Sequence, residues 1–244
     1  MENIHQETVN VRTYECGPDG TIYPHDLLRQ MQEAASNHAD RLGWGFADLE
    51  PRGLFWVLSV IRVEITHWPR FGTSIVLSTW PSGLNRLQAA REFLGTDRDG
   101  TLLFAASSSW MVLNRNSGRP HNLLQVNPPF PITEKRALQG PLRRTKPKNH
   151  STAGFSILVP ASALDINGHV NNTEYLRWAF DALCRRQGRP NLTTFQITFH
   201  SEVFAGDELE FSVQYTGPAW EVWGFQKDGG QSVVSVFFEI PEHP

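Results

Sequence analysis

The chain contains one pattern that occurs twice, and this repetition limits its possible folds more than any other feature. Both halves show a strand-like run, a gap that ends in glycine, and a second strand-like run. The pieces are Arg62 to Thr66, Gly72 and Ser74 to Ser78 in the first half, and Gln196 to His200, Gly206 and Glu208 to Ser212 in the second. The repetition indicates two copies of one folding unit.

Each copy also has one helix pattern. Apolar residues recur at three- and four-residue steps from Pro24 to Leu42, and Pro24 and Gly43 suit the start and the end of a helix. The segment from Asn171 to Gln187 shows a second apolar face at the same spacing. We predict one long helix in each copy, with Asn171 and Asn172 as caps of the second.

Short strand-like runs, separated by glycine, proline and aspartate, fill the rest of both halves. They are Asn10 to Tyr14, Leu54 to Thr66, Ser74 to Trp80, Leu87 to Asp97, Leu102 to Asn114, Ser151 to Val159, Leu192 to Val203, Glu208 to Thr216, Ala219 to Lys227 and Gln231 to Ile240. A lone helix can bury its apolar face only against the curved sheet. The predicted fold is α+β, a tandem (double) hotdog in which an antiparallel β-sheet wraps each helix. Two unrelated α+β units are the alternative.

The two copies are separated by a proline-rich, basic stretch with no apolar period. We therefore predict an N-terminal hotdog at residues 1–126, a linker at 127–150 and a C-terminal hotdog at 151–244. A cluster of cations lies at Arg143, Arg144, Lys146 and Lys148, and a second follows the helix at Arg177, Arg185, Arg186 and Arg189. Two interpretations are open: both clusters are ordinary solvated charge, or they form a surface that binds an acidic partner.

Composition excludes several classes of protein. The formal net charge of −3 gives no reason to expect a nucleic-acid partner. Met1 to Val11 has no apolar run with a cationic flank, and no stretch approaches the roughly 20 apolar residues of a membrane span. Cys16 and Cys184 are the only cysteines, too few for a disulfide framework. We expect a soluble protein of the cytoplasm.

One segment, Leu164 to Tyr175, concentrates polar side chains just before the second helix. Asp165, Asn167 and His169 alternate with other residues, so in an extended loop they would face one space. A helix start offers unpaired N–H groups to an oxyanion, and Gly168 permits close approach of a substrate. The alternative is that Asp165 and Asn167 are turn or cap residues and His169 is structural.

This segment resembles the Asp-x-Asn-x-His-Val-Asn-Asn-x-x-Tyr signature of the acyl-ACP (acyl carrier protein) thioesterases, which hydrolyse fatty acyl thioesters in plant plastids and many bacteria. The segments Tyr14 to Gly20 and Gln32 to Ala39, and Val63 to Ile65 with Pro69 and Gly72, are also similar to that family. The resemblance covers nearly the whole chain. It implies an acyl-ACP thioesterase whose partner is acyl carrier protein bearing a phosphopantetheine-linked acyl chain.

The resemblance also implies a catalytic set. Glu202 falls where the family has a glutamate, and we expect it to act as the general base on water, directly or with His169. His169 and Asn167 would orient water and thioester, and Asp165 would hold one of them. Plant members carry a cysteine after the glutamate; here Val203 stands there, which excludes that nucleophile. Trp68, near the equivalent place in the first copy, suggests that this copy lost its base.

The remaining expectations concern the substrate. We expect the acyl chain to bind along Met31, Ala35 and Trp56, with Gly168 and Val170 near the thioester. No metal-ligand motif, Walker loop or GxGxxG is present, so we predict no metal and no cofactor. A double hotdog contains its own pairing and suits a monomer or a homodimer. An acyl-CoA thioesterase of the same fold and a non-catalytic acyl-binding protein remain alternatives.

Overall fold

The computed structural model describes residues 3–125, 129, 131–142, 144–149, 154–217, 219–227 and 230–241. Contacts divide the chain into two compact units, Met1–Leu142 and Arg143–Pro244. The division falls inside the predicted linker, and the boundaries at 126, 127, 150 and 151 stay predictions. None of the helices in these ranges is long and apolar enough to cross a membrane.

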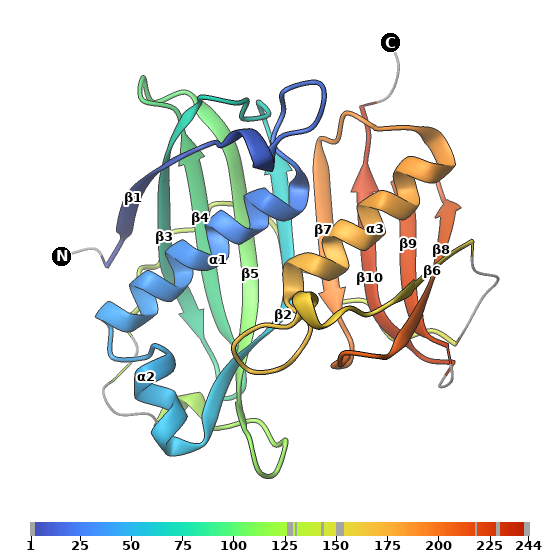
Figure 1. Cartoon of the computed structure of the whole chain (residues 1–244). Helices are drawn as coiled ribbons and strands as arrows, with labels where there is room; N and C mark the ends of the chain where they lie inside the picture. The colour runs from blue at the N-terminus through green and yellow to red at the C-terminus, as the bar shows by residue number, and fades with distance from the viewer. Residues whose placement is uncertain are drawn as a thin grey trace. The chain divides into compact units, whose positions relative to one another are not determined.

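Unit 1 is a five-stranded antiparallel sheet with one long helix on one face, as Figure 1 shows. The strands follow the order β1-β3-β4-β5-β2. Their bounds are β1 His5–Asn10, β2 Leu54–Ile65, β3 Ser74–Leu84, β4 Ala89–Thr96 and β5 Leu102–Asn114. The helices are α1 Pro24–Arg41 and the short α2 Phe46–Leu49, with 3-10 turns at Thr13–Glu15, Glu50–Arg52 and Leu123–Gln125.

Helix α1 forms where its apolar spacing predicted it. Pro24 occupies the first turn, and Gly43 follows the helix with a φ of 72°. Leu27, Leu28 and Met31 are fully buried. Because these side chains share one face at helical spacing, the helix can be stable only while that face lies against the sheet.

Unit 2 repeats the arrangement with the strand order β7-β10-β9-β8-β6 (Figure 1). Its elements are β6 Phe155–Leu158, a 3-10 turn at Ala161–Ala163, α3 Asn172–Gln187, β7 Thr194–Phe199, β8 Glu208–Tyr215, β9 Ala219–Gln226 and β10 Ser232–Glu239. Helix α3 packs on β8, β9 and β10, where Trp178 meets Phe211 edge to face with centroids 6.5 Å apart. Both side chains are almost fully buried and lie in the core of this unit.

Each unit has the same topology and the same hydrogen bonds at matching positions. In unit 1, Val11 N donates to Thr73 O, and Gly72 N donates to Val11 O. In unit 2, Val159 N donates to Asp207 O, and Gly206 N donates to Val159 O. Gly72 and Gly206 have φ values of 81° and 88°. The prediction of an α+β tandem hotdog is confirmed.

Three details of unit 1 differ from the sequence prediction. The first strand is His5–Asn10, and Thr13–Glu15 forms a 3-10 turn, so the predicted strand from Asn10 to Tyr14 is wrong. Strand β3 continues to Leu84, beyond its predicted end at Trp80, and its register shifts between Pro81 and Gly83. A bulge accommodates proline in a strand, so this proline did not end it. Helix α2 was not predicted, because four residues show no helical period.

Candidate active site

The loop before α3 closes on itself. Leu164 and Val170 form an isolated β-bridge, and Asp165 N donates to His169 O at 2.7 Å. Gly168 has a φ of 80°, a left-handed conformation that glycine adopts without strain. The segment is therefore a turn, and the expectation of an extended loop with alternating side chains is wrong.

Asp165 organises this turn through its side chain. Its Oδ1 accepts the backbone N–H of Asn167 at 2.8 Å and that of His169 at 3.2 Å. An aspartate that binds backbone amides further along the chain is typical of tight turns. The carboxylate thus fixes the backbone on which both predicted catalytic side chains are carried.

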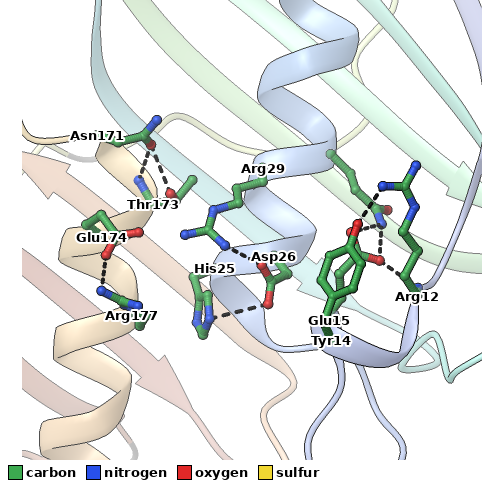
Figure 2. A network of polar contacts seen from close by, with 11 residues as sticks. Arg12, Tyr14, Glu15, His25, Asp26, Arg29, Asn171, Thr173, Glu174 and Arg177 are labelled. Carbon is green, nitrogen blue, oxygen red and sulfur yellow. Dashed lines mark hydrogen bonds and ion pairs between the residues drawn. The ribbon is translucent and has the colours of Figure 1, made fainter. Parts of the chain in front are cut away.

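The start of α3 is capped by Asn171, as predicted. Its side chain accepts the backbone N–H of Thr173 at 3.0 Å and the Thr173 hydroxyl at 2.9 Å (Figure 2). Glu174 N donates to Asn171 O at 2.9 Å. Asn172 is the first helical residue, so its prediction as a second cap is wrong. Its N–H has no hydrogen-bond partner among the described residues.

Glu202 lies in the loop after β7, because that strand ends at Phe199 rather than at the predicted Val203. Val170 N donates to Val203 O at 3.1 Å, which joins this loop to the turn before α3. As a result Glu202 Oε2 lies 3.7 Å from His169 Nε2. The Glu202 side chain is 45% exposed and the His169 side chain is 23% exposed, so both reach solvent.

Two aromatic side chains interact with this pair. Phe204 meets the His169 ring edge to face, with centroids 5.4 Å apart and planes at 73°. Tyr175, on α3, is buried. Burial, and next the Glu202 carboxylate, raise the pKa of Tyr175, so its phenol stays neutral. Sequence reasoning did not select Phe204, because no motif includes it.

Neither cysteine fits a nucleophile. Val203, directly after Glu202, is fully buried, and Cys16 and Cys184 lie elsewhere in the chain. Burial raises the pKa of Cys184 to about 11, so this thiol is protonated at neutral pH. Nothing in the described part of the chain gathers three or more potential metal ligands.

Unit 1 contains a backbone copy of the same turn. Cys16 and Ile22 form the matching β-bridge, Gly20 has a φ of 77°, and Ile22 N donates to Pro69 O at 3.0 Å. Thr21 stands in the place of His169, and Trp68 stands in the place of Glu202. Of these two matching sites, only the one in unit 2 therefore has the histidine and the carboxylate.

Both halves of the chain match models of one family. Residues 2–126 match the acyl-ACP thioesterase N-terminal domain, and residues 147–233 match the C-terminal domain of the same family. The chain belongs to the acyl-ACP thioesterase family.

Curated relatives agree with this assignment. A chloroplastic palmitoyl-acyl carrier protein thioesterase of Gossypium hirsutum is 28% identical over 73% of this chain and 47% of its own length. The oleoyl-acyl carrier protein thioesterase 1 of Arabidopsis thaliana is 26% identical over 73% of the chain and 54% of its own length. The chain thus spans about half the length of the curated relatives it matches.

Solved structures show the same fold. An acyl-ACP thioesterase from Bacteroides thetaiotaomicron superposes with a TM-score of 0.85 over 98% of both chains, at 23% identity. The 12:0-ACP thioesterase from Umbellularia californica gives the same TM-score and identity over 99% of this chain and 98% of its own.

The side chains predicted to line an acyl pocket in this thioesterase family member lie in two separate places within unit 1. Met31 and Ala35 are buried on the sheet-facing side of α1. Trp56 is half-buried, donates its Nε1–H to Trp44 O at 2.9 Å, and packs against the small core under α2. Their role in binding the acyl chain stays a prediction.

A polar cluster under α1 was not predicted. Arg91 on β4 is buried, and its guanidinium donates to His38 Nδ1 and to the Thr79 hydroxyl, each at 3.2 Å. His38 also stacks on His5 with centroids 5.5 Å apart. The position of His38 among the buried residues of α1 was the available signal.

One buried and one half-buried histidine, His38 and His200, make stability depend on pH. The pKa of His38 is lowered to about 4, mainly by burial and secondly by the positive charge of Arg91. The pKa of His200 is also lowered to about 4, mainly by burial and secondly by the charge of Arg144. The unfolded chain binds protons near pH 6.5 and the folded chain does not, so stability is lost as pH falls from about 6.5 toward 4. We expect Tm to fall by at least about 2 °C between pH 7 and 5.

The check is the pH dependence of Tm in a His38→Gln, His200→Gln double variant. Its loss between pH 7 and 5 should be smaller than that of the wild type. Replacing the exposed His67 with glutamine is the matched control. A double variant with an unchanged slope would show that other groups cause the acid sensitivity.

The predicted basic clusters are partly used inside unit 2. Arg144 donates to Phe199 O at 3.1 Å, and Lys148 pairs with Glu221 at 3.2 Å. Arg177 pairs with the buried Glu174 (Figure 2), and Arg185 lies over the Phe155 ring. Arg143 lies outside the described residues. These contacts hold those cations in place, whereas Lys146 and Arg186 are exposed.

Proposed function

We propose that this protein hydrolyses fatty acyl thioesters of acyl carrier protein to free fatty acid and the carrier thiol. The observation that carries the proposal is the approach of Glu202 to His169 within 3.7 Å at the start of α3, in a chain of this family. A carboxylate and an imidazole at this separation can share one water molecule.

In the proposed reaction, water attacks the thioester carbonyl while Glu202 takes its proton. His169 and Asn167 orient the water and the thioester, and Asp165 keeps their turn in shape. The tetrahedral oxyanion accepts a hydrogen bond from Asn172 N–H and is stabilised by the positive end of the α3 dipole. Collapse breaks the C–S bond, and the leaving thiolate takes the proton, so no acyl-enzyme forms.

Acyl carrier protein is acidic, and the exposed cations of unit 2 support it as the natural donor. Attraction between opposite charges raises association rates by at least about tenfold at low salt. We expect kcat/KM to be higher for palmitoyl-ACP or octanoyl-ACP than for palmitoyl-CoA, and to fall as salt is added. Thiol release from the three substrates is the measurement.

The other outcomes are informative. Release from the CoA ester alone would identify an acyl-CoA thioesterase of the same fold. Acyl binding without release from any substrate would favour a binding protein. The predicted location in the cytoplasm, and the predicted monomer or homodimer, are further proposals that fractionation and sedimentation can check.

A further inference from the structure

Two large apolar side chains in the loops that carry His169 and Glu202 face solvent. Ile166, at the tip of the turn before α3, is 77% exposed, and Phe204, beside the His169 ring, is 49% exposed. Ordinary solvent-facing turns need no such residues at their tips. Exposed apolar groups grouped at a polar site mark a surface that binds something.

The copy of this turn in unit 1 shows that the fold does not require an apolar side chain at the position of Phe204. Arg70 stands in the place of Phe204, and its guanidinium donates to Asp19 O at 2.7 Å, which ties its two loops together. Phe204 has no group that can make this bond. The contact of its phenyl ring with the other loop is the edge-to-face packing on the His169 ring, and the rest of the ring faces solvent.

A thioester substrate has an acyl arm and a thiol arm, and the exposure of Phe204 and Ile166 indicates which of the two these side chains can contact. A long acyl arm needs an enclosed apolar site that buries most of its surface. The thiol arm leads outward to the carrier and stays partly in solvent. Side chains that are 77% and 49% exposed suit the outward arm.

We propose that Phe204 and Ile166 bind the pantetheine arm of the substrate close to its sulfur. This inference rests on the proposed function. The two side chains cover the alkyl part of the arm and hold the thioester carbon beside Glu202 and His169. They set a preference for thioesters that carry this arm over thioesters with a short thiol.

The test compares two substrates with the same acyl group, octanoyl-pantetheine and S-methyl thiooctanoate. We expect the Phe204→Ala, Ile166→Ser double variant to lose about tenfold in kcat/KM on the pantetheine ester and less than about twofold on the methyl ester. Phe204→Leu, which keeps an apolar side chain, should retain most activity. Phe71→Ala, an exposed phenylalanine in unit 1, is the matched control.

Equal losses on both esters, or no loss on either, would overturn the proposal. Equal losses with a displaced pH profile would instead make Phe204 a residue that positions His169. Binding of the non-hydrolysable thioether octyl-pantetheine separates this inference from the proposed reaction. The double variant should bind it about tenfold more weakly than the wild type, even if neither protein hydrolyses a thioester.

Discussion

Replacing Glu202 with glutamine is expected to lower kcat on acyl-ACP by about 10²–10⁴-fold, because the amide cannot take a proton from water. The Glu202 side chain is 45% exposed, and it pairs with His169 at 3.7 Å. Its loss should therefore change the free energy of unfolding by less than about 0.5 kcal/mol. Single-turnover acyl release and thermal denaturation measure the two quantities.

Glu208→Gln is a suitable control for this variant. Glu208 is an exposed carboxylate of unit 2 that pairs with Lys227 at 2.6 Å, and it should be dispensable for turnover. Near-normal turnover in Glu202→Gln would remove Glu202 as the base. An acyl group trapped on the protein by acid quench would contradict direct attack by water.

Replacing Glu92 with alanine is expected to reduce the free energy of unfolding of unit 1 by about 3–5 kcal/mol. Glu92 is fully buried on β4 and accepts the hydroxyl protons of Ser82, at 2.6 Å, and Ser107. It also accepts Ala137 N–H at 3.1 Å and pairs with Arg136 Nε at 3.3 Å. Alanine would leave these donors without their acceptor.

Chemical denaturation followed by tryptophan fluorescence measures this effect. Glu92→Gln, which keeps an acceptor of similar shape, should cost less than Glu92→Ala. The control is Glu64→Ala, which breaks a half-exposed pair with Arg62 and should cost at most about 1 kcal/mol. A loss below about 1 kcal/mol for Glu92→Ala would mean that the buried donors find other acceptors.

The repeat and the long helices were predictable because they depend on local spacing. The apolar period from Pro24 predicted α1 to within one residue of its end at Arg41, and β5 was predicted with its bounds, Leu102–Asn114. Short elements gave no such signal. Helix α2 has too few residues to show a period, and the bulge at Pro81 looks like a turn when the partner strand is unknown.

The candidate site was predictable in composition and not in geometry. The identity of His169 and Glu202 came from motif spacing and resemblance. Their approach depends on the Val170–Val203 hydrogen bond between segments far apart in sequence, which no local pattern encodes. The burial of His38 and Arg91 was missed for a related reason, since polar side chains in a core need partners that only the folded chain brings together.

The duplicated turn has a consequence for how such a chain can evolve. In a symmetric dimer of single units, every substitution enters both copies at once. Fusion in one chain removes that constraint, so Trp68 and Glu202, or Arg70 and Phe204, can diverge at matching backbone positions. One copy is then free to lose its acid–base groups and to specialise, while the other keeps them under selection for turnover.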